Sequence, residues 1–264
     1  MKIDLSGKTA VVTGSSAGIG FAIAKGLAGT GALVIVNARG EDGVKSAIAK
    51  IKDVVPGAKL QGVASDVSTM DGCDKLARAV PEADILVNNA GGAMFKDFFA
   101  IPDDEWISMF QWNLMSGVRM SRAYMPDMLK KNWGRIVFIS SESALHIPKD
   151  MIHYGVMKAS QLAVSRGLAE LTAGTGVTVN SVLPGPTRTE RMEGFMAASA
   201  KREGITPEEA ANRFVKNFRG TSIIQRMATT DEVANMVVYA CSKEASATNG
   251  AALRVEGGIV RTIA

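Results

Sequence analysis

The sequence predicts an α/β protein whose core is one doubly wound parallel sheet with helices on both faces. Short apolar, β-branched runs alternate with helical stretches along the whole chain, and this alternation is typical of parallel sheets. The first apolar run, residues 9–13, leads into a glycine-rich turn at residues 14–20 and then into a helical stretch. The sequence has no internal repeat, low-complexity segment or linker, so we expect a single domain over residues 1–264.

The individual elements follow from the same pattern in chain order. Each predicted strand is a short apolar run, and the helices fall between these runs. The strands are expected at residues 9–13, 32–37, 60–63, 85–88, 135–139, 177–183 and 252–255. The helical segments are expected at residues 21–28, 42–54, 70–79, 103–131, 153–172, 190–219 and 230–242. Pro126 should end or bend the long helix that contains it, and Asp66 or Ser68 is the candidate cap of the helix at 70–79.

Composition and charge exclude several classes of protein. A hydrophobic content of 47% with 27 glycines and 8 prolines is that of a globular protein rather than a disordered or fibrous one. The basic residues behind the net charge of +4 are scattered, so we expect no nucleic-acid binding. No apolar run approaches the roughly 18 residues of a membrane span, and the N-terminus has no signal region. The distant Cys73 and Cys241 indicate a reduced, cytoplasmic protein without a metal site.

A turn with three glycines follows the first strand. Gly14, Gly18 and Gly20 have the spacing GxxxGxG between a strand and a helix. Glycines let the backbone turn tightly and come close to a pyrophosphate, and the helix N-terminus offers N–H groups and partial positive charge. The turn therefore predicts a dinucleotide site, with a plain flexible turn as the alternative.

The end of the second strand indicates which dinucleotide is bound. An acidic residue there would hydrogen-bond a free 2′-hydroxyl of the adenosine ribose, but this sequence has Asn37, Ala38 and Arg39. The guanidinium of Arg39 can make a forked contact with a 2′-phosphate. We therefore expect NADP(H) rather than NAD(H), with the alternative that Arg39 is solvated and paired with Glu41 or Asp42.

An ordered set of motifs resembles the short-chain dehydrogenase/reductase family over essentially the whole chain. The motifs are Gly14-x-x-x-Gly18-x-Gly20, Asn88-Asn-Ala-Gly91, Asn113, Ser141, Tyr154-x-x-x-Lys158 and Pro184-Gly185. Ser141 precedes Tyr154 by the family's usual 13 residues, which favours it over Ser140 and Ser143. The resemblance implies a Rossmann-like fold with a seven-stranded sheet in the order 3-2-1-4-5-6-7. It also implies an oxidoreductase that interconverts a carbonyl and a secondary alcohol, assembled as a homotetramer or homodimer.

The resemblance assigns catalysis to Asn113, Ser141, Tyr154 and Lys158. The ordinary tyrosine pKa of about 10 is too high for proton exchange near neutral pH, and a nearby ammonium lowers it. Lys158 lies one turn from Tyr154 on the same helix face, so Tyr154 is expected to be the general acid or base. Ser141 would hydrogen-bond the substrate oxygen, and the family places Asn113 on a water chain from Lys158. Taken alone, such a pair is more often a partly buried Tyr beside a Lys whose charged end reaches solvent, and the other motifs favour the functional interpretation.

Further cofactor contacts are carried over from the family's motifs. Besides Tyr154 and Lys158, the expected residues are Gly14, Ser15, Ser16, Gly18, Ile19, Gly20, Arg39, Asp66, Val67, Asn89, Ala90, Gly91, Pro184, Gly185, Thr187 and Thr189. Asp66 would accept from the adenine amino group unless it caps the next helix. Pro186 and Thr187 stand where many members have a bulky aliphatic residue, so the nicotinamide contacts are expected to differ in detail.

The substrate pocket is expected to be largely apolar. Its candidate residues are Met94, Phe95, His146, Met151, Met192 and Phe195. Methionines provide an adaptable apolar surface, which favours a substrate with apolar bulk and leaves 3-oxoacyl reduction open. Residues 190–219 are expected to form a helical lid over the cofactor. His153 is expected to be a helix cap or pocket wall rather than a catalytic base.

Other functions stay open at this point. One is an NAD-dependent alcohol or sugar dehydrogenase, and another is a non-catalytic nucleotide-sensing protein that keeps the fold. An epimerase or dehydratase is less compatible, because those relatives are longer and use a different glycine turn.

Overall fold

A computed structural model describes residues 2–263 and contains a large parallel sheet. Its strands are β1 (Thr9–Val12), β2 (Leu33–Ala38), β3 (Lys59–Ala64), β4 (Ile85–Asn88), β5 (Gly134–Ile139), β6 (Val177–Pro184) and β9 (Ala252–Val255). They lie in the order β3-β2-β1-β4-β5-β6-β9, which confirms the predicted order. Two short strands, β7 (Thr187–Arg188) and β8 (Ala228–Thr229), pair with each other outside this sheet.

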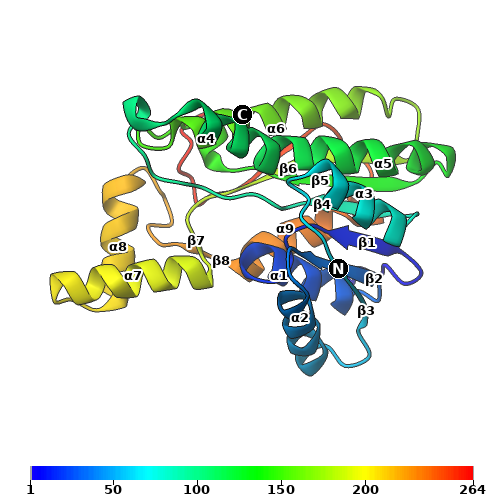
Figure 1. Ribbon diagram of the computed structural model, residues 1–264, viewed down its shortest axis with the longest axis horizontal. Helices are drawn as coiled ribbons and strands as arrows, with labels where there is room; N and C mark the ends of the chain where they lie inside the picture. The colour runs from blue at the N-terminus through cyan, green and yellow to red at the C-terminus, as the bar shows by residue number, and fades with distance from the viewer. Residues whose placement is uncertain (1, 264) are drawn as a thin grey trace.

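Helices cover both faces of the sheet (Figure 1). They are α1 (Gly18–Gly29), α2 (Glu41–Val54), α3 (Met70–Ala79), α4 (Asp103–Phe110), α5 (Ser116–Lys130), α6 (Ile152–Glu170), α7 (Glu190–Glu203), α8 (Pro207–Phe218) and α9 (Thr230–Ala240). Short 3₁₀ turns lie at Phe98–Ala100, Glu142–Ala144 and Lys243–Ala245. Helices α1, α2 and α9 pack on one face of the sheet, and α3, α5 and α6 pack on the other.

Two hydrophobic clusters explain why the strands are continuous apolar runs. Val12 and Val36 belong to the cluster beneath α1 and α9, whereas their neighbours Val11 and Ile35 belong to the cluster beneath α3 and α5. Successive side chains of a strand point to opposite faces, and both faces of this sheet are covered. Every position of β4, β5 and β6 is therefore buried, as expected for a parallel sheet.

The long helical region between β4 and β5 is not one regular helix. A π-helical turn at Gln111–Met115 separates α4 from α5 and contains Asn113. Helix α5 continues past Pro126 as far as Lys130, so Pro126 does not end the helix, which was one of the two expected outcomes. The interruption comes earlier in the chain, and it places Asn113 beside α6.

The segment at residues 190–219 that was expected to be helical consists of α7 and α8. These two helices project from the main body at the left of Figure 1. They have a small hydrophobic cluster of their own, formed by Met196, Ala200, Ala210, Ala211, Val215 and Met227. We call residues 190–219 the α7–α8 segment. Within residues 2–263, no helix combines the length and the apolar character needed to cross a membrane.

Candidate active site

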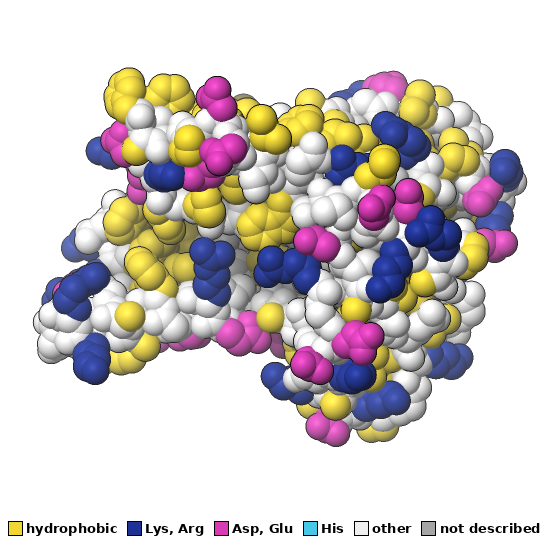
Figure 2. Space-filling model, in the orientation of Figure 1, with side chains coloured by type: hydrophobic (Ala, Val, Ile, Leu, Met, Phe, Trp, Pro, Cys, Tyr) yellow, Lys and Arg dark blue, Asp and Glu magenta, His cyan; other side chains and the backbone are white. Residues whose placement is uncertain are grey.

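Two adjoining cavities lie at the carboxyl edge of the sheet. The first has a volume of about 500 Å³ and is bordered by the ends of β5 and β6 and by α6 and α7. The second, of about 200 Å³, lies beside β2. Gly14, Asn89 and Gly91 line both. Figure 2 shows the surface hollowed above the α7–α8 segment, with hydrophobic side chains gathered there. Open parallel sheets bind ligands at this edge, and two joined cavities suit the two halves of an extended dinucleotide.

The glycine turn is shaped so that its backbone lies close to the cavities. Gly14 and Gly18 have φ values of 63° and 57°, in the left-handed region that favours glycine. A Cβ on Gly20 would lie only 2.4 Å from Nδ2 of Asn89 and 2.4 Å from the Gly14 carbonyl oxygen. The Asn89 amide donates to the Thr13 and Gly14 carbonyls at 2.9 and 3.0 Å. The Asn89 side chain therefore stabilises the glycine turn, and it fits there only because Gly20 has no side chain.

A carboxylate faces the N-terminus of α1. The Gly18 amide donates to Oε2 of Glu190, the first residue of α7, at 2.9 Å. Helix N-termini attract anions because their N–H groups lack partners and carry partial positive charge. Glu190 thus lies where a cofactor phosphate is expected to bind.

The end of β2 has the features expected for a phosphorylated ribose. Asn37 is almost inaccessible, and its amide nitrogen donates to the carbonyls of Val63 and Ser65 at 3.1 and 3.2 Å. Asn37 therefore holds β2 to β3 and is not available to a ribose hydroxyl. Arg39 is exposed beside the second cavity. In the described chain no ion pair involves Arg39, and Glu41 instead pairs with Lys45 at 3.3 Å.

Asp66 and Val67 follow β3 and line the second cavity. The Asp66 carboxylate accepts hydrogen bonds from the amide and hydroxyl of Ser68, at 3.0 and 2.7 Å. The N-cap of α3 is Thr69, which accepts from the Gly72 amide at 3.0 Å. The expectation that Asp66 or Ser68 caps this helix was wrong, because the chain completes a separate turn at Asp66 before the helix begins.

Most of the other predicted cofactor residues lie around the same cavities. Those that line the first are Gly18, Ile19, Gly20, Pro184, Gly185, Thr187 and Thr189. Ser16 and Ala90 line the second. Ser15 lines neither: it is fully buried, and its hydroxyl donates to the Val12 carbonyl at 2.7 Å. Ser15 thus supports the turn from beneath, and its backbone amide donates to the Asn37 carbonyl at 2.8 Å.

Ser141, Tyr154 and Lys158 line the first cavity together. Ser141 follows β5, while Tyr154 and Lys158 lie one turn apart on α6. Nζ of Lys158 is 5.6 Å from the centre of the Tyr154 ring and donates to the Ile139 carbonyl at 2.8 Å. The hydroxyl of the neighbouring Ser140 donates to the Lys158 carbonyl at 2.9 Å. The fold therefore gathers Ser141, Tyr154 and Lys158 in one site, while Ser140 ties β5 to α6.

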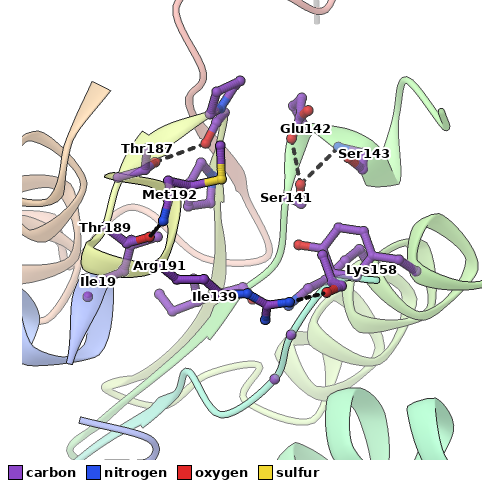
Figure 3. Close-up of a pocket in the computed structure, with 18 of the residues that line it drawn as sticks. Ile19, Ile139, Ser141, Glu142, Ser143, Lys158, Thr187, Thr189, Arg191 and Met192 are labelled. Atoms are coloured by element: carbon purple, nitrogen blue, oxygen red, sulfur yellow. Dashed lines mark hydrogen bonds between the residues drawn. The ribbon is translucent and has the colours of Figure 1, made fainter. Parts of the chain in front are cut away.

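A buried ion pair adjoins Ser141, and the sequence motifs gave no sign of it. The Ser141 hydroxyl donates to Oε2 of Glu142 at 2.5 Å and accepts from the Ser143 amide at 3.1 Å (Figure 3). Oε1 of Glu142 accepts from Nε of Arg219 at 2.6 Å. Both charged side chains are over nine-tenths buried, and both line the cavity. Arg219 comes from the end of α8, so this pair connects the α7–α8 segment to Ser141.

The surroundings of Tyr154 and Lys158 favour their neutral forms. Burial raises the pKa of Tyr154, and the negative charge of Glu142 raises it further. The hydrogen bond with Ser141 and the positive charge of Arg219 act in the opposite direction. Burial also lowers the pKa of Lys158 to about 7. Tyr154 is therefore a protonated phenol over a wide pH range, and Lys158 exchanges its proton near neutrality.

Asn113 lies deep behind the cavity rather than on its wall. Its side-chain oxygen accepts from the Gly92 amide at 3.0 Å. Its backbone carbonyl accepts from Nε2 of Gln161 at 2.5 Å, and Oε1 of Gln161 accepts from Lys158 at 3.2 Å. The connection from Asn113 to Lys158 thus runs through a side chain that the motif analysis did not single out.

The expected substrate pocket is only partly assembled from the predicted residues. Phe95, Met151 and Met192 line the first cavity, together with Phe214, which was not predicted. Met94, His146 and Phe195 do not line it. His146 is exposed beyond the 3₁₀ turn, and Phe195 packs edge-on against Phe214, with ring centres 6.5 Å apart.

His153 neither caps α6 nor forms a wall of the pocket. It is fully buried and packs edge-on against Trp106, with ring centres 5.8 Å apart. Burial lowers its pKa, despite the nearby charge of Glu105. The expectation of a cap or pocket wall was wrong, because the ring points toward α4 rather than toward the cavity.

Comparison with known proteins identifies close relatives. The family model described as short chain dehydrogenase matches residues 8–199. The uncharacterized oxidoreductase YvaG of Bacillus subtilis (strain 168) is 48% identical over 263 residues, with both chains covered in full. The 3-oxoacyl-[acyl-carrier-protein] reductase FabG of Escherichia coli (strain K12) is 34% identical, with 97% of this chain and 99% of FabG covered.

A solved structure agrees with the same fold over the whole chain. L-sorbose reductase from Gluconobacter frateurii, complexed with NADPH and L-sorbose, superposes with a TM-score of 0.93. It is 31% identical, and both chains are covered in full.

Proposed function

The chain belongs to the short-chain dehydrogenase family of oxidoreductases, and from that premise we propose that it interconverts a carbonyl and a secondary alcohol with NADP(H). The observation that carries the proposal is the convergence of Ser141, Tyr154 and Lys158 in one cavity that adjoins the glycine turn. The cofactor assignment is supported by Arg39 beside the second cavity and by the NADPH complex of the related L-sorbose reductase.

Tyr154 is the proton donor in reduction and the proton acceptor in oxidation. A bound NADPH supplies the hydride, so the protein has to supply the proton and the orientation. Burial and the Glu142 charge hold Tyr154 in its protonated form, which is the form that reduction consumes. Lys158 then favours the phenolate that remains after proton transfer, because an ammonium stabilises a nearby negative charge.

Ser141 positions the reacting oxygen. Its hydroxyl lies in the cavity with Tyr154, and two hydrogen-bond donors directed at one oxygen stabilise the negative charge that develops on it. In the structure the Ser141 hydroxyl donates to Glu142. Substrate binding must therefore turn this hydroxyl from Glu142 toward the substrate oxygen.

The walls of the cavity suit a substrate with an apolar part and a neutral polar part. Phe95, Met151, Met192 and Phe214 provide the apolar surface. Glu142 and Arg219 provide a polar corner next to Ser141. Arg219 is already neutralised by Glu142, so an anionic group gains little there, whereas a hydroxyl can both donate to Glu142 and accept from Arg219.

A second candidate, the reduction of a neutral hydroxyketone of the sugar type, is favoured by that polar corner. The related L-sorbose reductase is described with L-sorbose bound. The related FabG is described as a 3-oxoacyl-[acyl-carrier-protein] reductase, and the apolar wall favours that class. The two candidates share the site and the chemistry, and they differ in which wall of the cavity provides the binding energy.

A substrate panel tests the proposal. Purified protein is assayed with NADPH and NADH against simple ketones, 3-oxoacyl thioesters and ketoses, and the nicotinamide absorbance is followed. We expect oxidation of NADPH with at least one ketone and a slower reaction with NADH. Glu142→Gln should reduce turnover of a ketose more than that of a simple ketone. A complete lack of cofactor oxidation across the panel would favour a non-catalytic nucleotide-sensing role.

We also propose that the protein is a homotetramer or homodimer. Ile107 and Phe110 at α4, and Val156 on α6, are large apolar side chains that are exposed by 60%, 38% and 38%. Apolar side chains grouped on neighbouring helices are typical of association surfaces. Light scattering coupled to size-exclusion chromatography should give a mass of two or four chains; a monomer at micromolar concentration would contradict this.

A further inference from the structure

The π-helical turn at Gln111–Met115 presents a backbone carbonyl to the interior of the site. Such turns disturb the regular i→i−4 hydrogen bonding of a helix and are frequent at functional sites. Here the Asn113 carbonyl accepts from the side chain of Gln161 on α6 at 2.5 Å. Asn113 and Gln161 are 0% and 1% exposed, so this bond is shielded from solvent.

The chemistry of its neighbours fixes the orientation of the Gln161 amide. On one side is the Asn113 carbonyl, which can only accept, so Nε2 of Gln161 must face it. On the other side is Nζ of Lys158, which can only donate while it is charged, so Oε1 must face it. The Lys158–Gln161 distance of 3.2 Å agrees with this assignment. Oε1 and Nε2 of Gln161 therefore have one partner each, and the amide cannot be flipped without losing both hydrogen bonds.

Lys158 is thereby held on two sides. Its ammonium group has three N–H donors, and the structure commits one to the Ile139 carbonyl at 2.8 Å and one to Gln161. The remaining donor is left for the cavity that Tyr154 lines. Without Gln161, the four-carbon side chain of Lys158 would be fixed by a single bond and could turn away from Tyr154.

We propose that Gln161 is a positioning residue of the reaction, which links the Lys158 ammonium to the Asn113 backbone and directs it toward Tyr154. This inference rests on the proposed function, since it concerns the proton-transfer pair of the same site. The amide oxygen of Gln161 also stabilises the charged form of Lys158, which burial alone disfavours.

Two substitutions at Gln161 should have opposite effects on the pH profile. Gln161→Leu removes both hydrogen bonds, so Lys158 loses an acceptor and its pKa falls. Gln161→Glu places a carboxylate beside Lys158, so its pKa rises. Because the reaction needs the charged ammonium of Lys158, turnover with NADPH should decline as the pH rises through the pKa of Lys158. Compared with wild type, this decline should come about one pH unit lower in Gln161→Leu and about one unit higher in Gln161→Glu. We expect turnover near pH 7 to fall about tenfold in Gln161→Leu, while the Kd of NADPH changes by less than about threefold.

Ser160→Ala provides the matched control. Ser160 neighbours Gln161 on α6, and its hydroxyl donates only to the Val156 carbonyl at 2.8 Å. This variant should keep the wild-type pH profile and turnover. If Gln161→Leu is folded but has an unchanged profile, or if Gln161→Leu and Gln161→Glu shift it in the same direction, the positioning role is refuted. If Gln161→Leu does not fold, the upward shift in Gln161→Glu decides the question.

A measurement without substrate separates this inference from the proposed function. The unfolding free energy of the cofactor-free protein depends on the pKa of Lys158, so its pH dependence should differ between wild type and Gln161→Glu. If the substrate panel is negative but this difference is present, the function fails and the link between Gln161 and Lys158 stands. If turnover is present but wild type, Gln161→Leu and Gln161→Glu have the same pH profile of turnover and the same pH dependence of stability, the positioning role of Gln161 is refuted and the proposed function stands.

Discussion

At the scale of single residues, the site places a carboxylate next to Tyr154, the proposed proton donor. Glu142 accepts from Ser141 at 2.5 Å and is neutralised by Arg219 at 2.6 Å. The negative charge of Glu142 nevertheless raises the pKa of Tyr154, and the positive charge of Arg219 offsets only part of this effect. A protonated Tyr154 is suited to carbonyl reduction, whereas alcohol oxidation needs the phenolate. If Tyr154 is the proton donor, as we propose, we therefore expect reduction to be favoured at neutral pH.

Removing the Tyr154 hydroxyl should abolish turnover and leave cofactor binding in place. Tyr154→Phe keeps the ring but has no proton to donate, so we expect turnover to fall by at least about a hundredfold. The Kd of NADPH, measured by its fluorescence, should stay within about threefold. Tyr239→Phe, on α9 and away from both cavities, is the matched control. Near-normal turnover in Tyr154→Phe would refute the assignment.

Arg39 should determine the preference for the phosphorylated cofactor. Arg39→Ala removes the guanidinium that can fork onto a 2′-phosphate, so the Kd of NADPH should rise by about tenfold or more. The Kd of NADH, which lacks that phosphate, should stay nearly constant. Lys45→Ala removes a nearby exposed cation on α2 and should affect neither cofactor. An equal loss of affinity for both cofactors in Arg39→Ala would contradict the assignment.

At the scale of elements, the α7–α8 segment has the properties of a lid. It projects from the body with a small cluster of its own and contacts the site at three points. Glu190 accepts from Gly18 at 2.9 Å, Arg191 donates to the Ala93 carbonyl at 3.4 Å, and Arg219 pairs with Glu142. A segment with few contacts to the main core can open at low cost in free energy. We therefore propose that it closes over the cofactor.

Glu190 should compete with the cofactor phosphate for the N-terminus of α1. Glu190→Gln removes the negative charge and keeps the size, so we expect NADPH to bind about threefold to tenfold more tightly, in line with the energy of a charge at a helix terminus. Glu193→Gln is the matched control, because Glu193 lies one turn further along α7 and pairs with Arg188 at 3.3 Å. Weaker binding in Glu190→Gln would show instead that Glu190 supports the cofactor site.

NADPH should protect the α7–α8 segment from proteolysis. If the segment closes on the cofactor, limited trypsin digestion at Lys201, Arg202 and Arg213, which lie within it, should slow when NADPH is added. Cleavage at Lys50 and Lys52 at the far end of α2 serves as the internal reference. Equal rates of cleavage within the segment, with and without NADPH, would argue against a lid.

At the scale of the whole molecule, the fold buries an ionisable amine at a cost in stability. Burial lowers the pKa of Lys158 from its ordinary value of 10.5 to about 7. Between these values the unfolded chain binds a proton that the folded chain does not, so this group makes stability rise with pH. Above about pH 10 the raised pKa of Tyr154 has the opposite effect, because the unfolded chain ionises first.

Replacing Lys158 by an apolar residue should remove this pH dependence. Urea unfolding without added cofactor is measured at about pH 7 and about pH 9.5, and wild type should gain about 3 kcal/mol relative to Lys158→Met over that range. Lys50→Met, an exposed position on α2, should follow the wild type. If wild type and Lys158→Met show the same pH dependence, the burial of Lys158 does not affect stability in this way.

The sequence by itself determined the family, the strand order and the choice of motif residues. Parallel strands that are buried on both faces must be continuous apolar runs, so residues such as Val11 and Val12 reveal them directly. Sequence alone also identified the glycine turn, Ser141 and the Tyr154–Lys158 pair. Each of these motifs is short, and together they follow one another along the chain in the order and spacing of the family.

Only the tertiary structure decided which other side chains join the site. Glu142 meets Arg219 across 77 positions of sequence, Gln161 meets the Asn113 carbonyl across 48, and Glu190 meets Gly18 across 172. These contacts form because β5, α6 and α7 come together at one edge of the sheet, and no local pattern records them. For the same reason His146 and Phe195, which the chain order places near the site, lie outside its cavity.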